Sequence, residues 1–548
     1  MCRIWTRGVA AAGALCAALV LVPASAGAHQ PDCSGSYVLT PAPSADLFTD
    51  WTGEDRGCVL PATPSNTAAA ASGDEVVTAS SKPAGGSFTQ VGHNPLMRRG
   101  MNAAIAVSGN YAYIGSRTDL HPGTPTGGVM VVDISNPSNP TLLGKPFDPK
   151  PGESTRELRI WQSQHVLIVL NTNCGPGPAL HLCTQDSVSN IRFYDISGAN
   201  AAKPKLLNEF RVDTHEFFLW QDPKNLGRAL IFAGNATSTC DIRGGAPSCP
   251  FSVWDISSVP SGGSPTTLYS GLHGYTRYPA DPSQPVQTPT GGLHSPTVTN
   301  DGSRGYWALL TGGFATVDVS DFANGAATPR PRLITANESR PTWPGPGAHS
   351  AVKLWGRDTV WVSDEVYGAA TGLGHGCPWG WVRIVDVTNP QAPTVQAEYR
   401  ERENDPSTCA AWNPPRTSYS AHNPTLTPHI AFSTWHSEGI EAVGLADPLH
   451  PAKLAQFTPK PLSQVTFEDP RLSSDPDTGR NEKVVMWSYA IVKDGLIYVV
   501  DLRNGLYVLR YRGPFQDEVS SIRFLEGNSN QGDALCYEPI GSPPSYCR

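Results

Sequence analysis

Four histidines between residues 215 and 422 stand in similar short segments and could together bind a metal ion. They occur in Thr214-His215-Glu216, Leu293-His294-Ser295, Ala348-His349-Ser350 and Ala421-His422-Asn423, each followed by a segment with the pattern of a β-strand. Neutral imidazoles that converge without thiolate ligands suit Cu, Fe or Zn. If the four segments meet in space, the sequence predicts a site for one transition-metal ion.

The segments belong to a repeat of about 60 residues, a period typical of four-stranded propeller blades. The copies are clearest in the third strand of each unit, at residues 128–137, 191–197, 251–257, 314–320, 381–390, 439–448 and 505–510. Five of these end in Asp with Ser or Thr two residues later. This pattern starts turns through hydrogen bonds from the backbone to the Asp side chain, so we interpret these aspartates as structural. We predict an all-β fold, a seven-bladed β-propeller of four-stranded antiparallel blades.

The strand that closes the last blade has two candidates in the sequence. Either Phe88 to Val91 supplies it from the N-terminal side, or Ser521 to Leu525 supplies it from the C-terminal side. The sequence leaves both open.

Some copies of the repeat resemble a known family. Val131-Val132-Asp133, Ile384-Val385-Asp386 and residues 109–114 look like the LVIVD repeat of secreted and surface bacterial β-propellers. The resemblance covers about residues 100–512 and implies the propeller fold. It implies no particular activity, because the repeat marks strands and turns.

The first strand of each propeller blade lies nearest the axis, so the residues that open these strands are expected at one mouth of the central channel. In chain order they are Asn102, Arg156, His215, His294, His349, His422 and Tyr489. The longest loops, at residues 173–190, 235–249 and 366–380, open onto the same face, together with the ends of the second strands. We therefore predict a ligand-binding mouth formed by Asn102, Arg156 and Tyr489 with Arg117, Asp364, Glu365, His436 and Glu438.

The histidine ring allows two interpretations. Glu157 and Glu216 beside ring positions could orient metal-bound imidazoles through their second nitrogen. The arrangement is similar, in architecture only, to the carotenoid-cleaving oxygenases and to the selenium-binding protein and methanethiol oxidase propellers, a similarity that implies redox chemistry. Alternatively, the histidines are consensus residues of the repeat that hydrogen-bond the loop of the neighbouring blade.

The N-terminal residues have the features of a secretory signal peptide. Residues 1–28 contain Arg3 and Arg7, an apolar run over residues 9–22 and small residues at 24–28. We predict a secreted protein with a disulfide-bearing segment and low-complexity linker over 29–95, the propeller over 96–512 and an extension over 513–548. No later segment reaches the ~20 apolar residues of a membrane span.

Ten of the 12 cysteines remain after the predicted signal peptide, and an even number in an exported chain indicates disulfides. They lie in sequence-neighbour pairs, although spacing does not fix which pairs form: Cys33 and Cys58, Cys174 and Cys183, Cys240 and Cys249, Cys377 and Cys409, Cys536 and Cys547. A zinc site is the other reading, but the CxxC spacing typical of zinc knuckles is absent from the sequence.

Charge and motifs narrow the function to two classes. The formal charge of -8, which becomes more negative without Arg3 and Arg7, argues against a nucleic-acid partner. The sequence has neither a nucleophile elbow nor a phosphate-binding glycine motif. We expect either a secreted binding or scaffold propeller, whose loop-rich face binds a protein, glycan or small molecule, or a metal-dependent oxidase or oxygenase that uses the four histidines.

Overall fold

The computed structural model describes the larger part of the chain from residue 85 onward. The described residues are 85–116, 127–150, 153–173, 190–212, 214–235, 246–273, 292–310, 312–343, 347–365, 380–404, 419–466 and 484–524, with short strands at 38–39, 58–59, 75–78, 241–243, 276–277 and 535–537. The predicted signal peptide, residues 1–28, lies outside them.

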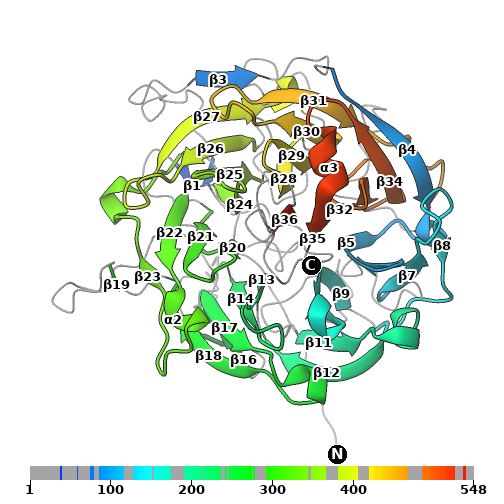
Figure 1. Cartoon of the computed structure of the whole chain (residues 1–548), viewed down its shortest axis with the longest axis horizontal. Helices are drawn as coiled ribbons and strands as arrows, with labels where there is room; N and C mark the ends of the chain where they lie inside the picture. The colour runs from blue at the N-terminus through cyan, green and yellow to red at the C-terminus, as the bar shows by residue number, and fades with distance from the viewer. Residues whose placement is uncertain are drawn as a thin grey trace, which may run out of the picture.

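Seven four-stranded antiparallel sheets surround a common axis, so the predicted seven-bladed β-propeller is confirmed (Figure 1). From the axis outward, blades 1 to 3 consist of β5 (Asn102–Ser108), β6 (Tyr111–Ser116), β7 (Met130–Asp133) and β8 (Thr141–Leu142); β9 (Glu153–Trp161), β10 (Val166–Asn173), β11 (Asn190–Asp195) and β12 (Lys205–Arg211); β13 (Glu216–Gln221), β14 (Ala229–Gly234), β17 (Phe251–Asp255) and β18 (Thr266–Gly271).

Blades 4 to 7 continue the ring with the same antiparallel order. They consist of β20 (Ser295–Val298), β21 (Arg304–Ala308), β22 (Phe314–Asp318) and β23 (Arg332–Leu333); β24 (Ala348–Lys353), β25 (Thr359–Asp364), β26 (Val382–Asp386) and β27 (Thr394–Arg400); β28 (Ala421–Leu426), β29 (Ile430–Trp435), β30 (Gly439–Gly444) and β31 (Ala452–Phe457); β32 (Ile491–Lys493), β33 (Leu496–Asp501), β34 (Gly505–Arg512) and β4 (Ser87–Asn94). Two blades have a fifth strand that pairs in parallel with their outer edge. These strands are β19 (Thr276–Arg277) in blade 4 and β3 (Glu75–Thr78) in blade 5.

The N-terminal strand β4 closes the ring by pairing with β34, as the adjoining blue and red strands of Figure 1 show. Of the two candidates for the closing strand, the segment around Phe88 to Val91 is therefore the one used. The other candidate contributes β35 (Ile522–Phe524), which pairs with β36 (Leu535–Tyr537) instead. Because β4 begins at Ser87, the propeller begins before the expected boundary at residue 96.

The core lies between neighbouring blades, because each sheet buries both faces against the next sheet. This explains why the second strands read as uninterrupted apolar runs, which a half-exposed strand would not do. All six residues of β14 and of β33 are buried, and Trp161, Trp307 and Trp361 are fully enclosed.

The aspartates that end the third strands have the structural role predicted for them. The Oδ1 atom of each accepts a hydrogen bond from the backbone N–H two residues ahead. The bonds are Asp133 to Ser135, Asp195 to Ser197, Asp255 to Ser257 and Asp386 to Thr388 at 2.8 Å, and Asp318 to Ser320 at 2.9 Å.

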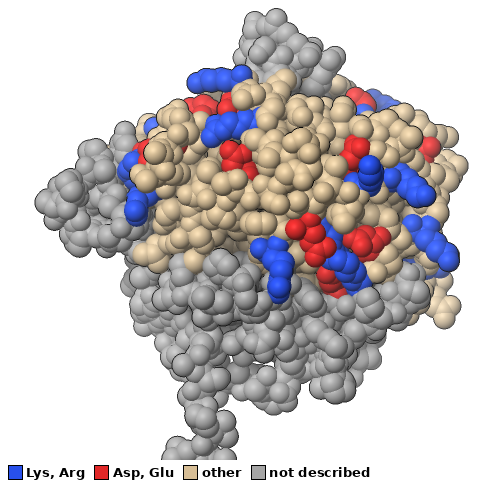
Figure 2. Space-filling view, turned by 90° about the horizontal axis from the view of Figure 1, so that it is seen from below, with Lys and Arg blue, Asp and Glu red and all other residues tan. Residues whose placement is uncertain are grey.

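The remaining elements are short. They are β1 (Val38–Leu39) paired with β2 (Cys58–Val59), β15 (Asp241–Arg243) paired with β16 (Ala246–Ser248), the helices α2 (Ser320–Ala323) and α3 (Gln516–Ser521), and the 3-10 turns η1 (Leu96–Arg98), η2 (Gln162–Gln164), η3 (Gly198–Ala201), η4 (Val259–Ser261), η5 (Asn337–Ser339) and η7 (Arg402–Asn404). None of the helices in the described residues is long and apolar enough to cross a membrane. On the side seen in Figure 2, acidic and basic side chains lie next to one another.

Candidate metal centre at the propeller axis

The four predicted histidines lie side by side along an arc formed by blades 3 to 6. Ring centroids of neighbours are 4.5 Å apart for His215 and His294, 3.9 Å for His294 and His349, and 4.2 Å for His349 and His422. Four blades thus direct one imidazole each toward the same place.

Irregular strand pairing helps to direct two of these side chains. The register between β24 and β25 shifts between Ala348 and Ser350, so His349 is left without a partner position. A similar shift in β28 lies between Ala421 and Pro424 and includes His422. Bulges of this kind turn a side chain away from its regular direction, and they are frequent beside functional sites.

A fifth histidine and two glutamates complete the cluster. Glu365 directly follows β25, and its Oε1 lies 2.9 Å from Nε2 of both His422 and His436, while its Oε2 lies 3.4 Å from Nε2 of His349. Glu216 opens β13, with Oε1 3.8 Å from Nε2 of His349 and Oε2 3.8 Å from Nδ1 of His294.

Neighbouring side chains bond two of the imidazoles at Nδ1. The Ser295 hydroxyl lies 2.9 Å from Nδ1 of His294 and donates a short hydrogen bond to Oε2 of Glu216. The Asn423 side-chain amide lies 2.9 Å from Nδ1 of His422. Because the Ser295 hydroxyl donates to Glu216, it accepts from Nδ1–H of His294 and leaves the lone pair of that ring on Nε2, an orienting role that outer-shell groups have in metal sites.

The cluster is enclosed, and burial and neighbouring charges shift the pKa values of three of its groups. None of the five histidines and two glutamates is more than 8% exposed. Burial, together with the charge of Arg156 for His215 and the nearby His294 for His349, lowers the pKa of both imidazoles well below 6.5. Burial alone would raise the pKa of Glu365, but the adjacent His422 and His349 lower it well below its usual range.

The opposite side of the mouth, from blades 2 and 7, carries an Arg–Trp pair and a buried ion pair. The Arg156 guanidinium lies 5.7 Å from the ring centroid of Trp487, which in turn lies 5.3 Å from the His422 ring. Glu157 pairs with Arg159 at 2.8 Å, and burial raises the pKa of Glu157 to about 7, with Arg159 acting in the opposite direction.

Four other predicted mouth residues lie in structural contacts outside the cluster. Asn102 accepts a hydrogen bond from Arg99 and donates to the Leu502 carbonyl, and the Tyr489 hydroxyl donates to the Leu158 carbonyl at 2.7 Å. The remaining two are carboxylates that accept hydrogen bonds. Asp364 accepts from Trp343 and Arg383, and Glu438 accepts from Gln456. Arg117 lies outside the described residues.

Sequence reasoning treated Glu216 as an orienting residue and placed Glu365 and His436 in the general mouth, whereas the geometry groups all three with the histidines. The ligand atoms form three sets, and within each set they lie within 4.8 Å of one another. The sets are His215, Glu216 and His294; His294, His349 and Glu365; and Glu365, His422 and His436. The available signal was position, because Glu365 and His436 both directly follow a second strand.

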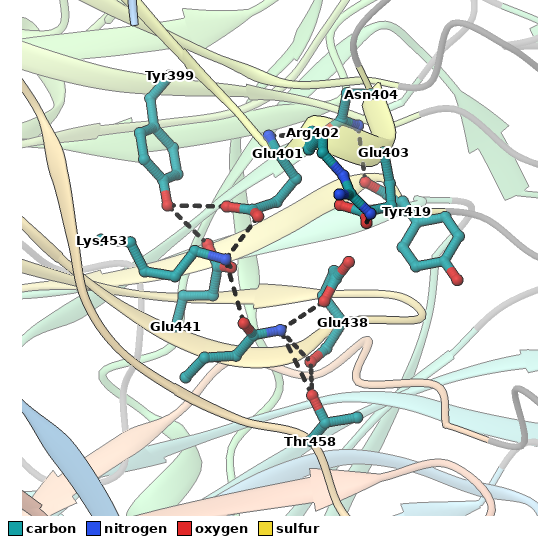
Figure 3. Close-up of polar contacts among 11 residues, drawn as sticks. Tyr399, Glu401, Arg402, Glu403, Asn404, Tyr419, Glu438, Glu441, Lys453 and Thr458 are labelled. Atoms are coloured by element: carbon teal, nitrogen blue, oxygen red, sulfur yellow. Dashed lines mark hydrogen bonds and ion pairs between the residues drawn. The ribbon is translucent and has the colours of Figure 1, made fainter. Parts of the chain in front are cut away.

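A separate acidic cluster lies between blades 5 and 6, where Glu401, Glu403 and Glu438 approach one another (Figure 3). Beneath it, Lys453 pairs with Glu401 at 2.5 Å and with Glu441 at 3.0 Å, and the Tyr399 hydroxyl lies 3.0 Å from both carboxylates. This lysine partly neutralises the cluster from inside the protein, so we interpret it as a structural network.

The predicted disulfides fall largely outside the described residues. Cys249 is described, and it is buried and disulfide-bonded. Nothing further is described of the side chains of the other nine cysteines.

Comparison with known proteins identifies one copy of the repeat. Residues 99–146 match the model of the LVIVD repeat. No curated protein sequence matches the chain significantly. Similar solved structures include Sqt1 of Saccharomyces cerevisiae, with 9% identity and a TM-score of 0.41 over 78% of this chain and 100% of that one.

Two further similar structures each share 15% identity with this chain. Sqt1 of Chaetomium thermophilum, bound to the N-terminus of the ribosomal protein L10, has 15% identity and a TM-score of 0.38 over 76% of this chain and 89% of that one. A hypothetical selenium-binding protein of Sulfolobus tokodaii has 15% identity and a TM-score of 0.34 over 55% and 66%. The protein is thus a seven-bladed β-propeller that carries an LVIVD repeat.

Proposed function

We propose that the protein is a metal-dependent propeller that binds a transition metal, Cu, Fe or Zn, in the axial cluster of histidines and glutamates. The observation that supports this most directly is the convergence of His215, His294, His349 and His422 from four successive blades, with ring centroids 3.9 to 4.5 Å apart. Imidazole and carboxylate donors without thiolates are the set that these metals accept.

Electrostatics favour a metal over a purely hydrogen-bonded histidine ring. Crowded buried imidazoles are costly as cations, and the pKa values of His215 and His349 are lowered accordingly by burial, so these rings offer lone pairs at neutral pH. Nδ1 of His349 is buried and makes no hydrogen bond to the described residues. A bound cation would also compensate the buried carboxylates of Glu216 and Glu365.

Elemental analysis of the protein, purified aerobically without chelators, tests this proposal. We expect at least stoichiometric Cu, Fe or Zn, and a lower metal content in the double variant His294→Ala/His349→Ala. His450→Ala is the matched control, because the side chain of His450 is 59% exposed and pairs with Asp447 away from the cluster. Wild-type protein with less than about a tenth of an equivalent, even after metal is added back, would contradict the proposal.

A metal-dependent oxidase or oxygenase is the second candidate, because each of the three histidine-containing ligand sets combines two histidines with one carboxylate. This combination is the facial set of many non-haem iron oxygenases. Oxygen consumption by the iron-loaded, desalted protein with a reductant, compared with the same preparation of His215→Ala/His436→Ala, tests it. Equal consumption by the two proteins would leave metal binding without redox chemistry.

We also propose that the protein is exported and that its loop-rich face binds a protein, glycan or small molecule. Support comes from the features of residues 1–28 and from the long insertions at 173–190, 235–249 and 366–380. N-terminal sequencing of protein from the culture medium of an expressing bacterium tests export, and a mature chain that starts near residue 29 is expected.

A further inference from the structure

We infer that the axial cluster holds two metal ions rather than one, the first bound by His215, Glu216 and His294 and the second by Glu365, His422 and His436. The inference rests on the proposed metal-binding function and specifies how the ligands are shared. It also assigns Glu216, Glu365 and His436 as direct ligands.

The two ligand sets share no residue, and each is complete by itself. Each consists of two imidazoles and one carboxylate whose ligand atoms lie within 4.8 Å of one another. Metal bonds of about 2.0 to 2.2 Å place ligand atoms roughly 3.4 Å apart in a tetrahedral site. In the second set, Oε1 of Glu365 lies 2.9 Å from Nε2 of both histidines, so only a small outward shift is needed to admit an ion.

The Glu365 carboxylate separates the second set from the rest of the cluster. Its Oε1 is directed at His422 and His436, whereas its Oε2 is directed at Nε2 of His349, 3.4 Å away. Glu216 likewise has one oxygen toward His294 and the other toward His349. His349 therefore lies between the two sets and can add a fourth ligand to one of them.

A single ion in the middle accounts for the cluster less well. Such an ion would use His294, His349 and Glu365, the set that shares one residue with each of the other two. Glu216, which is 6% exposed, would then lie outside the ligand set, and His215 and His436 would have no part in binding. Two ions place one divalent charge beside each buried carboxylate, which avoids the cost of an isolated buried anion.

Metal stoichiometry tests the inference. Metal-free full-length protein is dialysed against Zn²⁺ alone, desalted and analysed for zinc, with His215→Ala changing one set and His436→Ala the other. We expect about two equivalents in the wild type, about one in each variant and none in the double variant. His450→Ala should retain the wild-type amount.

The outcomes separate this inference from the proposal on which it rests. A wild type that saturates at one equivalent, or a single variant that loses all zinc, overturns the two-ion arrangement while metal binding stands. A wild type that takes up no zinc, copper or iron overturns both. The wild-type value needs no substitution, so it decides the question even if a variant fails to fold, which circular dichroism would detect.

Discussion

At the scale of single residues, Ser295 connects the two kinds of ligand in the cluster. Its hydroxyl contacts Nδ1 of His294 at 2.9 Å and donates to Glu216, which fixes the ring orientation of one ligand and the rotamer of another. Ser350 follows His349 in the same way along the chain, but its hydroxyl donates to the backbone carbonyl of His422 at 3.1 Å. The two serines are therefore a matched pair with different expected effects.

Ser295→Ala should weaken metal binding about 10-fold to 100-fold, the usual effect of removing a group that orients a metal-bound imidazole. Ser350→Ala should change the affinity far less, because its hydroxyl contacts no imidazole nitrogen. Competition with a chromophoric chelator measures both values. Equal affinities in the two variants would show that Ser295 does not orient His294.

Lys453 is the buried cation of the acidic cluster, only 5% exposed, and it pairs with Glu401 and Glu441 (Figure 3). Lys453→Met should destabilise the protein by about 3 to 5 kcal/mol, because two buried carboxylates lose their compensating charge. Adding Glu441→Gln should restore part of the loss. Urea denaturation measures the unfolding midpoint of each variant, and Lys224→Met on an exposed turn is the control. An unchanged midpoint for Lys453→Met would contradict the predicted loss of stability.

At the scale of elements, β4 holds the ring closed between blade 7 and blade 1. A Cβ atom built at Gly92 would lie 2.1 Å from the Pro137 carbonyl oxygen, so this strand approaches the backbone of the next blade closely. Gly92→Ala should destabilise the protein by about 1 to 3 kcal/mol, since backbone must move to relieve the contact.

Gly227→Ala is the control for this substitution, because its nearest neighbour would be a side-chain oxygen of Asn225 at 3.4 Å. Thermal denaturation and limited proteolysis near residue 86 compare the two variants. If Gly92→Ala is as stable as Gly227→Ala, β4 is not tightly seated.

The helix α3 fastens the C-terminal residues to blade 6 through Glu518. This buried carboxylate accepts hydrogen bonds from the Thr427 hydroxyl at 2.8 Å and the His429 backbone N–H at 3.1 Å, and it pairs with the His429 ring. Glu518→Ala should release α3 and increase proteolysis after residue 512, because bonds to a charged group contribute about 1.5 to 3 kcal/mol each. The control is Asp517→Ala, on the exposed side of the same helix, which the protease should cut as slowly as the wild type.

The strands and turns could be predicted from sequence because they depend on local rules that repeat in every blade. The third strands and the turns after Asp133 and Asp386 follow directly from alternating apolar residues and Asx chemistry. The closing strand could not be chosen, because Phe88 to Val91 and Ser521 to Leu525 have equivalent patterns and only packing against Pro137 and its neighbours distinguishes them.

The site could be predicted less completely. The four histidines were found because they share one position in the repeat, whereas the direction of Glu365 and His436 depends on how the chain turns after a second strand. Tyr489 shares the ring position but turns into the core to bond the Leu158 carbonyl, a choice made by contacts from another blade. Register identifies candidates, and packing decides which of them face the axis.

At the scale of the whole molecule, the cluster links four blades that also contact one another through apolar packing and polar contacts such as the Lys453–Glu401 ion pair. The chain segments that carry its ligands extend from His215 to His436, and the ring is closed separately by β4. A metal that binds only the folded ring therefore stabilises contacts between blades 3 and 6. This stabilisation by the metal adds to the stabilisation of the ring by β4, which joins blade 7 to blade 1.

Removing the metal should therefore lower the thermal stability of the whole propeller. A ligand that binds only the folded state at 100 times its dissociation constant contributes about 2.7 kcal/mol per site. We expect dialysis against EDTA to lower the Tm and Zn²⁺ to restore it, whereas His215→Ala/His436→Ala, which changes both ligand sets, should have the same Tm under both conditions. The variant separates the site from unspecific effects of the chelator, since both proteins meet the same solution. Identical wild-type Tm values with and without metal would show that the blades are held together without help from the axis.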